Sequence, residues 1–522
     1  MRFPINVYGD TLAHCLDNTI AAISKWMNKN HELMFMTLWK YNFDKINFEE
    51  INKGEKYNKY DLMKDDNKLY LLKKYHGIQS ISHTEGDFET TKKRIIKELN
   101  EGMPVSIYID SYFCPWFKPK YRRTHSSHFC LVIGVDEEEK GFWIADGQMA
   151  MEGDYLPFEE YEKGFGPYLT YKKVPSSEEE NISYKEVLSI VIEGLVTEQQ
   201  NQFDEIKKFA NKMEENIIYY DKWKECGIHV EFLLSAQRIK SVSNTLYYLY
   251  GKYGIDEIFN LAERMNVCSG RWMSIYGMYM KTFFISEYNN ILYRICNKVQ
   301  EAAEEDEKLY YDIKKLINKK EIQIKSGITK TKINHNLNIK YNFIDINHLF
   351  NNIGFHKVLN NCNPEFSYGQ RYYISEGLPK DRLIKKNGMQ FMFPDIKSVK
   401  YDNISCLGQE IKIDQDKYSY IMLLGAAELG DQIDNIYIHY EDGGVEKIII
   451  NFSTWRSYKP MYQEEIMWKG KSHCKAEEKI GMEPQMACIY GITNKLNSTS
   501  NIEKIQLPIC PNIHIFGITL CK

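Results

Sequence analysis

Two polar segments divide the 522-residue chain into regions whose hydrophobic patterns differ. The first segment, VPSSEEEN at 174–181, is acidic and contains serine, and the second, from Ser326 to Lys340, is basic and rich in asparagine. Polar stretches of this kind are typical of exposed linkers. Since single domains usually hold about 100–200 residues, a chain of this length also favours about three domains. We therefore predict domains at 1–175, 183–320 and 340–522.

The first region combines two helical patterns with several strands that come later. Apolar residues recur at helical spacing over Cys15–Met27 and Phe88–Asn100, and Gly102 ends the second pattern. Short runs bounded by turn-forming residues follow at 103–110, 128–135, 141–146 and 168–174. Helices followed by an antiparallel sheet predict an α+β fold for this region.

The second and third regions carry opposite patterns. Residues 183–318 lack strand alternation and contain long helical repeats, which predicts a small helical bundle. Beyond residue 340, Gly and Pro separate short alternating runs such as YSYIMLLG and KIIINFS, which predicts a β-sandwich of the jelly-roll kind. The expected fold class of the whole chain is therefore α+β, with a helical middle domain and a C-terminal jelly roll.

Composition and charge argue against several classes of protein. The chain has 67 Lys and Arg against 71 Asp and Glu, and this net charge of −4 gives no reason to expect nucleic acid as the main partner. No apolar stretch approaches the roughly 20 residues that span a bilayer. The N-terminal sequence MRFPINVYGD is not followed by the apolar segment of a secretory signal. We expect a cytoplasmic protein that does not bind nucleic acid or membrane.

The spacing of the cysteines and the absence of glycine-rich motifs indicate which metals and cofactors the chain is expected to bind. The twelve cysteines form no CxxC pair, and His473 and Cys474 are an isolated pair of neighbours, so neither a zinc site nor a disulfide framework is predicted. Most of these cysteines should be buried thiols in a reducing compartment. No P-loop or GxGxxG element is present, which argues against ATP and dinucleotides. We therefore expect neither a metal nor a cofactor.

Cys15 lies at the start of the first predicted helix. Backbone N–H groups and the helix dipole favour a thiolate at such a position, so a nucleophile there would be activated. A buried structural cysteine is the alternative. His14 would be a capping or packing residue, while Asn18, one turn further on, would be a local cap or part of an oxyanion site. We therefore leave Asp17 and Asn18 off the list of catalytic residues.

A second signal lies in the run THSSHFCLVIGVDEEEKGFWIADG. His128 begins one predicted strand, Asp146 ends the next, and a tight turn joins the two strands. Antiparallel neighbours would bring both side chains to the same end of the sheet, where the carboxylate could orient an imidazole that accepts a proton from a thiol. The alternatives are a histidine bonded to backbone and an aspartate that caps the turn before Gly147. The order Cys, His, Asp is that of papain-like cysteine enzymes.

Three further residues on the loop before His128 are candidates for the site. His125 competes with His128 for the role of base, and we prefer His128 because it adjoins the strand whereas His125 falls in the loop. Tyr112 and Trp116 could form the wall of an acyl or amine pocket, with plain packing beside Pro115 as the alternative.

Three stretches of this region also resemble a known family, the N-terminal domain of the butirosin ribostamycin acyltransferases. These stretches are HCLDNTIAAI at 14–23, IDSYFCPWFKPKYRRTHSSHF at 109–129 and GVDEEEKGFWIADG at 134–147. Members of that family are similar to cysteine proteases and move an acyl group from a carrier protein to an amine. The resemblance covers about the first 175 residues and implies a papain-like fold. It also implies that Cys15 is the nucleophile, His128 the base and Asp146 the residue that orients the base.

The resemblance implies a thiol-dependent acyltransferase of natural-product or antibiotic biosynthesis. Its partners would be an acyl or peptidyl carrier protein with a phosphopantetheine thioester and an amine acceptor. Among such proteins the chain resembles the amide synthases that build the polythioamide closthioamide by joining an aryl-β-alanyl chain to a diamine. A hydrolase or peptidase with the same three residues is the first alternative. A non-catalytic protein that binds a glycan or a small metabolite is the second.

The third region resembles the jelly-roll, carbohydrate-binding-like modules attached to some glycosidases. The stretches that carry this resemblance include FSYGQRYYISEGLP, LLGAAELGDQIDNIYIHYEDGG and IFGITL. Tyr440, Asp442 and Trp455 are the candidates for a ligand surface, through stacking and hydrogen bonds. The alternative places both aromatic rings in the core and Asp442 in a hairpin turn.

Overall fold

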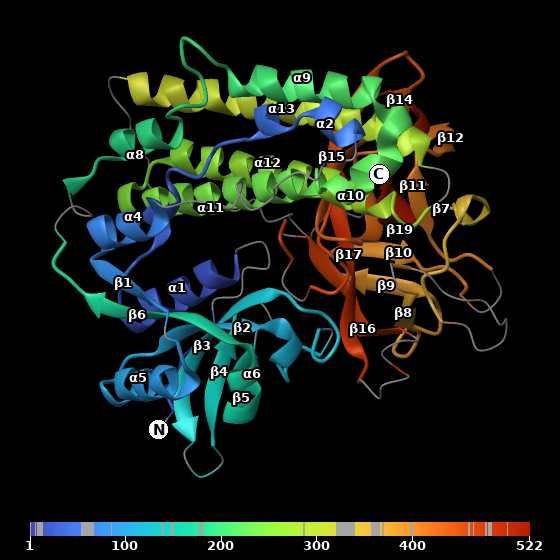
Figure 1. Cartoon of the computed structure of the whole chain (residues 1–522). Coiled ribbons are helices and arrows are strands. Elements are labelled where there is room, and N and C mark those ends of the chain that lie inside the picture. The colour runs from blue at the N-terminus through green and yellow to red at the C-terminus, as the bar shows by residue number, and fades with distance from the viewer. Residues whose placement is uncertain are drawn as a thin grey trace.

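Three regions of the computed structural model follow one another along the chain and lie against one another in space (Figure 1). An α+β region comes first, a layer of long helices second and antiparallel β-structure last. The structure describes all residues except 1, 6, 8–13, 54–66, 85, 119, 137, 139, 148–150, 177–180, 286–287, 320–339, 357–365, 368–369, 397–399, 458–459, 463, 475–477, 479–482 and 498–499.

An antiparallel sheet forms the base of the first region. Its order is β1-β6-β2-β3-β4-β5, and the bounds are Ile78–His83 (β1), Val105–Asp110 (β2), Ser127–Asp136 (β3), Gly141–Asp146 (β4), Met151–Pro157 (β5) and Phe165–Lys173 (β6). The four predicted strands are confirmed as β2, β3, β4 and β6. Sequence analysis missed β1 and β5, because their polar sequences IQSISH and MEGDYLP lack the apolar alternation of a half-buried strand.

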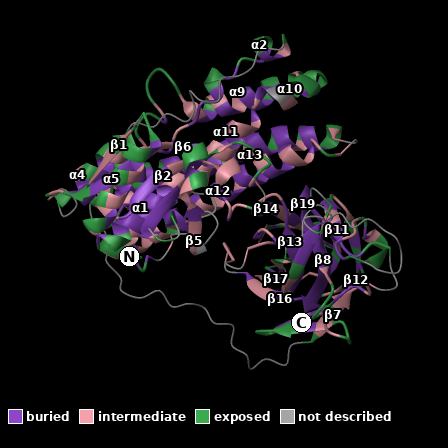
Figure 2. Ribbon diagram, turned by 60° about the horizontal axis from the view of Figure 1, so that its bottom comes forward, coloured by how far each residue is buried: buried purple, intermediate pink, exposed green. Residues whose placement is uncertain are grey.

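Both helices predicted in the first region are confirmed. The helices here are α1 (Cys15–Trp26), α2 (Phe48–Asn52), α4 (Asn67–His76), α5 (Phe88–Asn100) and α6 (Phe158–Gly164). Helix α1 packs against β2 and β3, and Figure 2 shows that most of it is buried. The side chain of His14 accepts a hydrogen bond from the N–H of Leu16, and Asp87 caps α5 in the same way through Thr90. These caps satisfy N–H groups that lack a partner within the helix.

The middle region is the predicted helical bundle. Its helices are α8 (Tyr184–Val191), α9 (Gln202–Glu215), α10 (Tyr220–Cys226), α11 (His229–Tyr253), α12 (Asp256–Lys281) and α13 (Asn289–Asn318). Helix α11 ends at Gly254, whose φ of +66° is a left-handed conformation that glycine adopts without strain. Within the described part of the chain, no helix is both long and apolar enough to cross a membrane.

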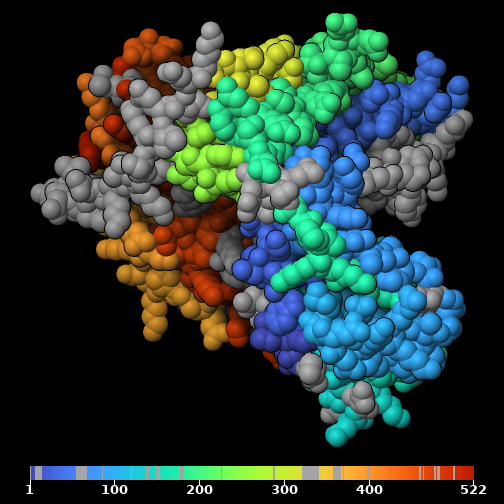
Figure 3. Space-filling model, turned by 90° about the vertical axis from the view of Figure 1, so that its left-hand side faces the viewer, coloured from blue at the N-terminus to red at the C-terminus, as the bar shows by residue number. Residues whose placement is uncertain are grey.

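An early segment of the chain, residues 31–52, packs into this bundle. The Tyr41 hydroxyl donates a 2.5 Å hydrogen bond to the buried carboxylate of Asp306 on α13, and the Trp272 indole donates to the same oxygen at 2.7 Å. The ring of Phe43 stacks on Trp272 with centroids 5.3 Å apart. Residues near the blue end of the chain accordingly adjoin the green helices in Figure 3. The first two regions therefore share a hydrophobic core.

The third region consists of antiparallel sheets. The larger described sheet has the order β11-β19-β13-β17-β16-β8 with β7 paired to β19, the smaller has the order β12-β18-β14-β15, and β9 and β10 form a hairpin. The strands are Tyr341–Ile344 (β7), Arg371–Ile374 (β8), Leu383–Lys386 (β9), Met389–Met392 (β10), Ile404–Leu407 (β11), Glu410–Asp416 (β12), Tyr420–Ala427 (β13), Gln432–Tyr440 (β14), Val445–Phe452 (β15), Glu465–Cys474 (β16), Gln485–Lys495 (β17), Ile502–Gln506 (β18) and Ile509–Cys521 (β19). Short 3-10 turns occur at Glu32–Phe35, Phe43–Lys45, Ser111–Phe113, Ile217–Tyr219 and Asn347–Leu349.

The expected α+β class, the helical middle region and the C-terminal antiparallel β-structure are confirmed. The papain-like fold, the jelly-roll topology and the three domain boundaries stay predictions. Of the two predicted linkers, the centre of 174–181 and nearly all of 326–340 lie outside the described residues.

Two of the three candidates for a ligand surface on the third region, Tyr440 and Trp455, do not lie at the surface. Tyr440 and Trp455 are 3% and 2% exposed, because their rings lie within the core between strands. Asp442 sits in the turn between β14 and β15, where its carboxylate accepts a hydrogen bond from the N–H of Gly444. The alternative of core aromatics and a hairpin turn therefore holds.

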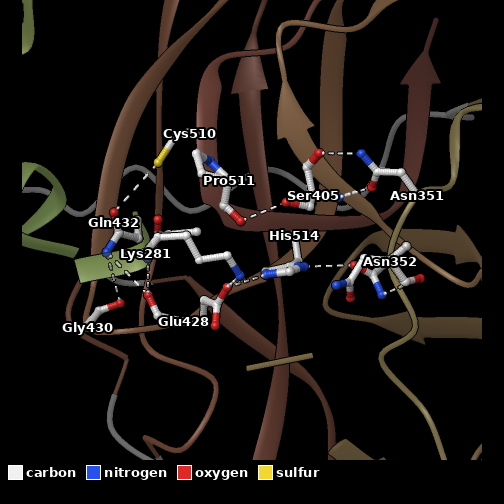
Figure 4. A network of polar contacts seen from close by, with 12 residues as sticks. Lys281, Asn351, Asn352, Ser405, Glu428, Gly430, Gln432, Cys510, Pro511 and His514 are labelled. Carbon is white, nitrogen blue, oxygen red and sulfur yellow. Dashed lines mark hydrogen bonds and ion pairs between the residues drawn. The ribbon is translucent and has the colours of Figure 1, made fainter. Parts of the chain in front are cut away.

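Buried ion pairs connect helices α12 and α13 to the β-structure of the third region. Lys298 on α13 donates to Asp434 on β14 at 2.7 Å, and both side chains are almost fully buried. Lys281, at the end of α12, pairs with the buried Glu428, which in turn lies 3.4 Å from His514 (Figure 4). Helix α12 comes this close because Gly277 has no Cβ, which would lie 2.6 Å from the amide nitrogen of Gln432.

The electrostatics of Glu428 depend on this contact. Burial alone would raise the pKa of its carboxyl, but Lys281 and His514 lower it from its ordinary 4.5 to about 2. A depressed folded-state pKa means that the group stabilises the fold above pH 4.5 and loses this effect as the pH falls toward 2.

We predict that Lys281→Met lowers the free energy of unfolding by about 3–5 kcal/mol, because it leaves the Glu428 carboxylate buried without its cation. The double variant Lys281→Met/Glu428→Gln removes both charges and should recover most of this loss. Thermal and urea unfolding at pH 7 measure both effects. Equal stability of the wild type and Lys281→Met would contradict the prediction.

Candidate active site

The predicted site forms where three elements meet. Cys15 is the first residue of α1, His128 is the second residue of β3, and Asp146 is the last residue of β4. Strands β3 and β4 are antiparallel neighbours, with Leu131 paired to Ala145, so the start of one lies beside the end of the other. The structure therefore brings together the three residues that the sequence predicted.

His128 and Asp146 form a buried hydrogen-bonded pair. His128 Nε2 and Asp146 Oδ2 are 2.6 Å apart, and each residue is 1% exposed. The indole N–H of Trp116 donates to the same carboxylate oxygen at 2.8 Å. The ring of Phe117 packs edge-on against the imidazole of His128, with centroids 5.3 Å apart. These contacts fix the imidazole in one orientation and leave its Nδ1 for another partner.

Cys15 is the neighbour that interacts with this imidazole, and each of the two groups shifts the pKa of the other. The Cys15 sulfur lies 3.9 Å from His14 Nδ1. Cys15 is only partly buried, in contrast to His128 and Asp146, which are each 1% exposed. The predicted capping role of His14 is confirmed, and its contact with the thiol was not predicted.

The protonation states follow from these contacts. Burial raises the pKa of the Cys15 thiol, but hydrogen bonds to His128 and His14 outweigh it and lower the pKa to about 6. Burial lowers the pKa of His128, but Asp146 and Cys15 outweigh it and raise the pKa to about 9. Between these two values the pair is therefore a thiolate and an imidazolium, the charge state of an activated nucleophile.

The pKa values of the other thiols near the site shift in the opposite direction. Burial raises the pKa of Cys114 and Cys130, and the negative charge of Asp146 raises both further. Every described cysteine other than Cys15 is buried. Cys15 is thus the described cysteine whose surroundings lower the pKa of its thiol, and its role as the nucleophile stays a prediction.

Hydrogen bonds to the sheet hold α1 in position. One turn after Cys15, the Thr19 hydroxyl accepts a 2.8 Å hydrogen bond from Ser106 on β2, and Ser106 also lies 2.7 Å from the Tyr171 hydroxyl on β6. In the first turn, the carboxylate of Asp17 binds the Lys68 amine at 3.0 and 3.1 Å. These bonds fix the start of α1 relative to α4 and to the sheet that carries His128.

The alternative base and the predicted pocket aromatics have other contacts. His125 is exposed, lies 2.6 Å from Asp110 and stacks on Tyr112 with ring centroids 4.3 Å apart. Its described partners are thus Asp110 at the end of β2 and Tyr112 on the loop, whereas the Cys15 thiol interacts with His128 and His14. Trp116 is 5% exposed and supports Asp146. Contact of Tyr112 or Trp116 with a substrate stays a prediction.

Sequence reasoning missed the supporting roles of Trp116 and Phe117, since no spacing in the chain indicates that this loop folds back on β3 and β4. Within the described residues, no three His, Cys, Asp or Glu side chains come together as a metal site would require.

Comparison with known proteins supports the resemblance that the motifs carried. The family model for the N-terminal domain of butirosin biosynthesis protein H matches residues 14–147, which include Cys15, His128 and Asp146. The resemblance of this region to the butirosin family is thereby confirmed. A model for an AziU2-like beta-sandwich domain matches residues 341–522. This match supports the predicted β-sandwich, under a family different from the carbohydrate-binding modules that its motifs suggested.

One curated relative is a transferase of Niallia circulans. Its name is ribostamycin:4-(gamma-L-glutamylamino)-(S)-2-hydroxybutanoyl-[BtrI acyl-carrier protein] 4-(gamma-L-glutamylamino)-(S)-2-hydroxybutanoate transferase. The two chains are 26% identical over 167 residues, which is 32% of this chain and 49% of the relative. The chain therefore spans about half the length of the curated relative that it matches.

We predict that iodoacetamide alkylates Cys15 with a rate that rises through pH 6 and is then level up to about pH 9, because the thiolate forms at about pH 6. The variant His128→Gln should shift this midpoint toward about 8.5, the value of a free cysteine. Peptide mapping by mass spectrometry locates the label, with Cys15→Ser as the unlabelled control. A wild-type midpoint above 8 would contradict the predicted ion pair.

Proposed function

We propose that this chain is a cysteine-dependent acyltransferase that moves an acyl group from a carrier-protein thioester onto an amine, with amide formation. The observation that carries the proposal is the hydrogen-bonded series Cys15, His128 and Asp146 at the start of α1. The match of residues 14–147 to the butirosin family and the named activity of the curated relative support it.

In the first half-reaction the Cys15 thiolate attacks the thioester carbonyl. The N-terminal end of α1 stabilises negative charge on the sulfur and on the nearby tetrahedral oxyanion. When the intermediate collapses, the carrier thiol leaves and takes the proton of the His128 imidazolium. The product of this step is an acyl-enzyme with a neutral imidazole beside it.

In the second half-reaction a neutral amine attacks the acyl-enzyme. His128 accepts the proton that the amine loses, and the Cys15 thiolate leaves as the amide forms. This step restores the thiolate and imidazolium of the free enzyme. Throughout, Asp146 accepts a hydrogen bond from Nε2 of His128 and so holds the imidazole in one orientation, with Nδ1 as the nitrogen left for the sulfur.

The choice between amine and water decides the class of enzyme. An acyl-enzyme on Cys15 is common to a transferase and to a hydrolase, so the triad alone supports both. We favour the transferase because the relative is named as a transferase from an acyl-carrier protein. The family resemblance is the reason why we propose an amine, and in particular a diamine, as the acceptor.

We predict that wild-type protein mixed with acyl-carrier thioesters gains the mass of the acyl group, and that Cys15→Ala does not. Added amine should discharge the adduct as an amide. Intact-mass spectrometry follows the adduct, and chromatography identifies the product. Discharge by water at the same rate with and without amines would indicate the hydrolase, whereas no adduct with any donor would favour a binding protein.

A second prediction concerns Trp116, whose indole orients Asp146. Trp116→Phe removes one hydrogen bond to a charged group, which is worth about 1.5–3 kcal/mol, so the acylation rate should fall roughly 10- to 100-fold. The alkylation midpoint of Cys15 should move up, because Asp146 then holds His128 less firmly. Trp143→Phe on β4 serves as the matched control, since this indole contacts Tyr155 and Arg2. An unchanged rate in Trp116→Phe would remove Trp116 from the site.

A further inference from the structure

The loop that supports the triad is also the most positively charged segment beside it. Residues 111–126, which we call the basic loop, hold Lys118, Lys120, Arg122 and Arg123. No Asp or Glu occurs between Asp110 and Asp136, although acidic residues outnumber basic ones in the whole chain by 71 to 67. The basic loop therefore concentrates positive charge on a protein that is negative overall.

This charge lies next to the catalytic residues. Phe117 contacts the ring of His128, and Trp116 binds Asp146. Lys118 follows Phe117 directly, and the Lys120 amine lies over the Phe117 ring, 5.0 Å from its centroid. An anion bound at these cations would be separated from His128 by a single aromatic side chain.

The four cations differ in how they are held. Lys120 donates to the Ser126 hydroxyl at 2.7 Å, and Arg122 pairs with Glu160 at 2.5 Å, so both contribute to the shape of the loop. Lys118 and Arg123 are exposed, and neither forms an ion pair within 4 Å among the described residues, although the charge of Lys118 also acts on the carboxylate of Asp154 on β5. Their charge is therefore available to a partner, while the paired cations keep the loop in place.

We propose that the basic loop is the docking surface for the acidic carrier protein, with Lys118 and Arg123 as its main contacts. This inference rests on the proposed function. The thioester arm joins the carrier through a phosphodiester, so the approach of the arm to Cys15 brings phosphate and the negative surface of the carrier toward the basic loop. Opposite charges at such a rim speed association and fix the orientation of the partner.

A second cluster of lysines lies at the other end of α1 and serves for comparison with the basic loop. Lys25, Lys29 and Lys252 line a groove beyond the other end of α1. Lys25 is ten residues after Cys15, which is about 15 Å along a helix. The residues of α1 between them, 17–24, are buried, so an arm that entered at this groove would not reach the sulfur. This groove therefore supplies the control for an effect of charge alone.

The test compares two pairs of charge reversals with equal change in net charge. Binding of phosphopantetheinylated acyl- and peptidyl-carrier proteins is measured by calorimetry on the Cys15→Ala background, which separates docking from chemistry. We expect Lys118→Glu/Arg123→Glu to weaken binding at least tenfold and to remove its dependence on salt, and Lys29→Glu/Lys252→Glu to leave binding unchanged. Lys118→Arg/Arg123→Lys should keep wild-type affinity.

A kinetic arm uses one acyl group on two donors, the carrier protein and N-acetylcysteamine. With Cys15 present, Lys118→Glu/Arg123→Glu should slow acylation by the carrier at least tenfold and leave acylation by N-acetylcysteamine unchanged. Equal loss with both donors, unchanged carrier affinity, or an equal effect of the Lys29 and Lys252 pair would overturn the inference. Carrier binding through the basic loop without any acylation of Cys15 would instead overturn the proposed function and leave the docking surface standing.

Discussion

The buried hydrogen bond between His128 and Asp146 is the interaction on which the chemistry of this site depends. Both groups are shielded from water, so a charge on either of them is stable only because the other is present. The carboxylate raises the pKa of the imidazole, and the resulting imidazolium lowers that of the Cys15 thiol. The aromatic residues of the basic loop, Trp116 and Phe117, maintain this pair by a hydrogen bond and by packing.

Buried carboxylates that are paired with a partner group also hold the three regions together. A buried carboxylate of one region is neutralised or hydrogen-bonded by a neighbouring region in each case. Asp306 on α13 accepts from Tyr41 of the early segment, Asp434 on β14 binds Lys298 of α13, and Glu428 binds Lys281 of α12. Because an unpaired buried charge is costly, these contacts favour one arrangement of the regions over others.

In the function proposed above, the basic loop also links catalysis to recognition of the carrier protein. Its aromatic residues face the triad, whereas its cations Lys118 and Arg123 face solvent. A partner that binds these cations contacts the same short segment that fixes His128 and Asp146. The proposed docking surface and the aromatic side chains that support His128 and Asp146 therefore belong to one loop.

The sequence by itself determined the local features of this protein. Helical and alternating patterns predicted α1, α5, the helical bundle and the strands β2, β3, β4 and β6, because burial of one face imposes a period on the chain. The order of a helix-start Cys15, a strand-start His128 and a strand-end Asp146 predicted that the three would meet, and the structure places them together. Only the tertiary structure decided the features that depend on contacts between distant segments. These features are the support of Asp146 by Trp116, the packing of residues 31–52 among the helices and the burial of Tyr440 and Trp455. No periodic pattern in the sequence indicates them, because each results from packing between segments that are distant in the chain.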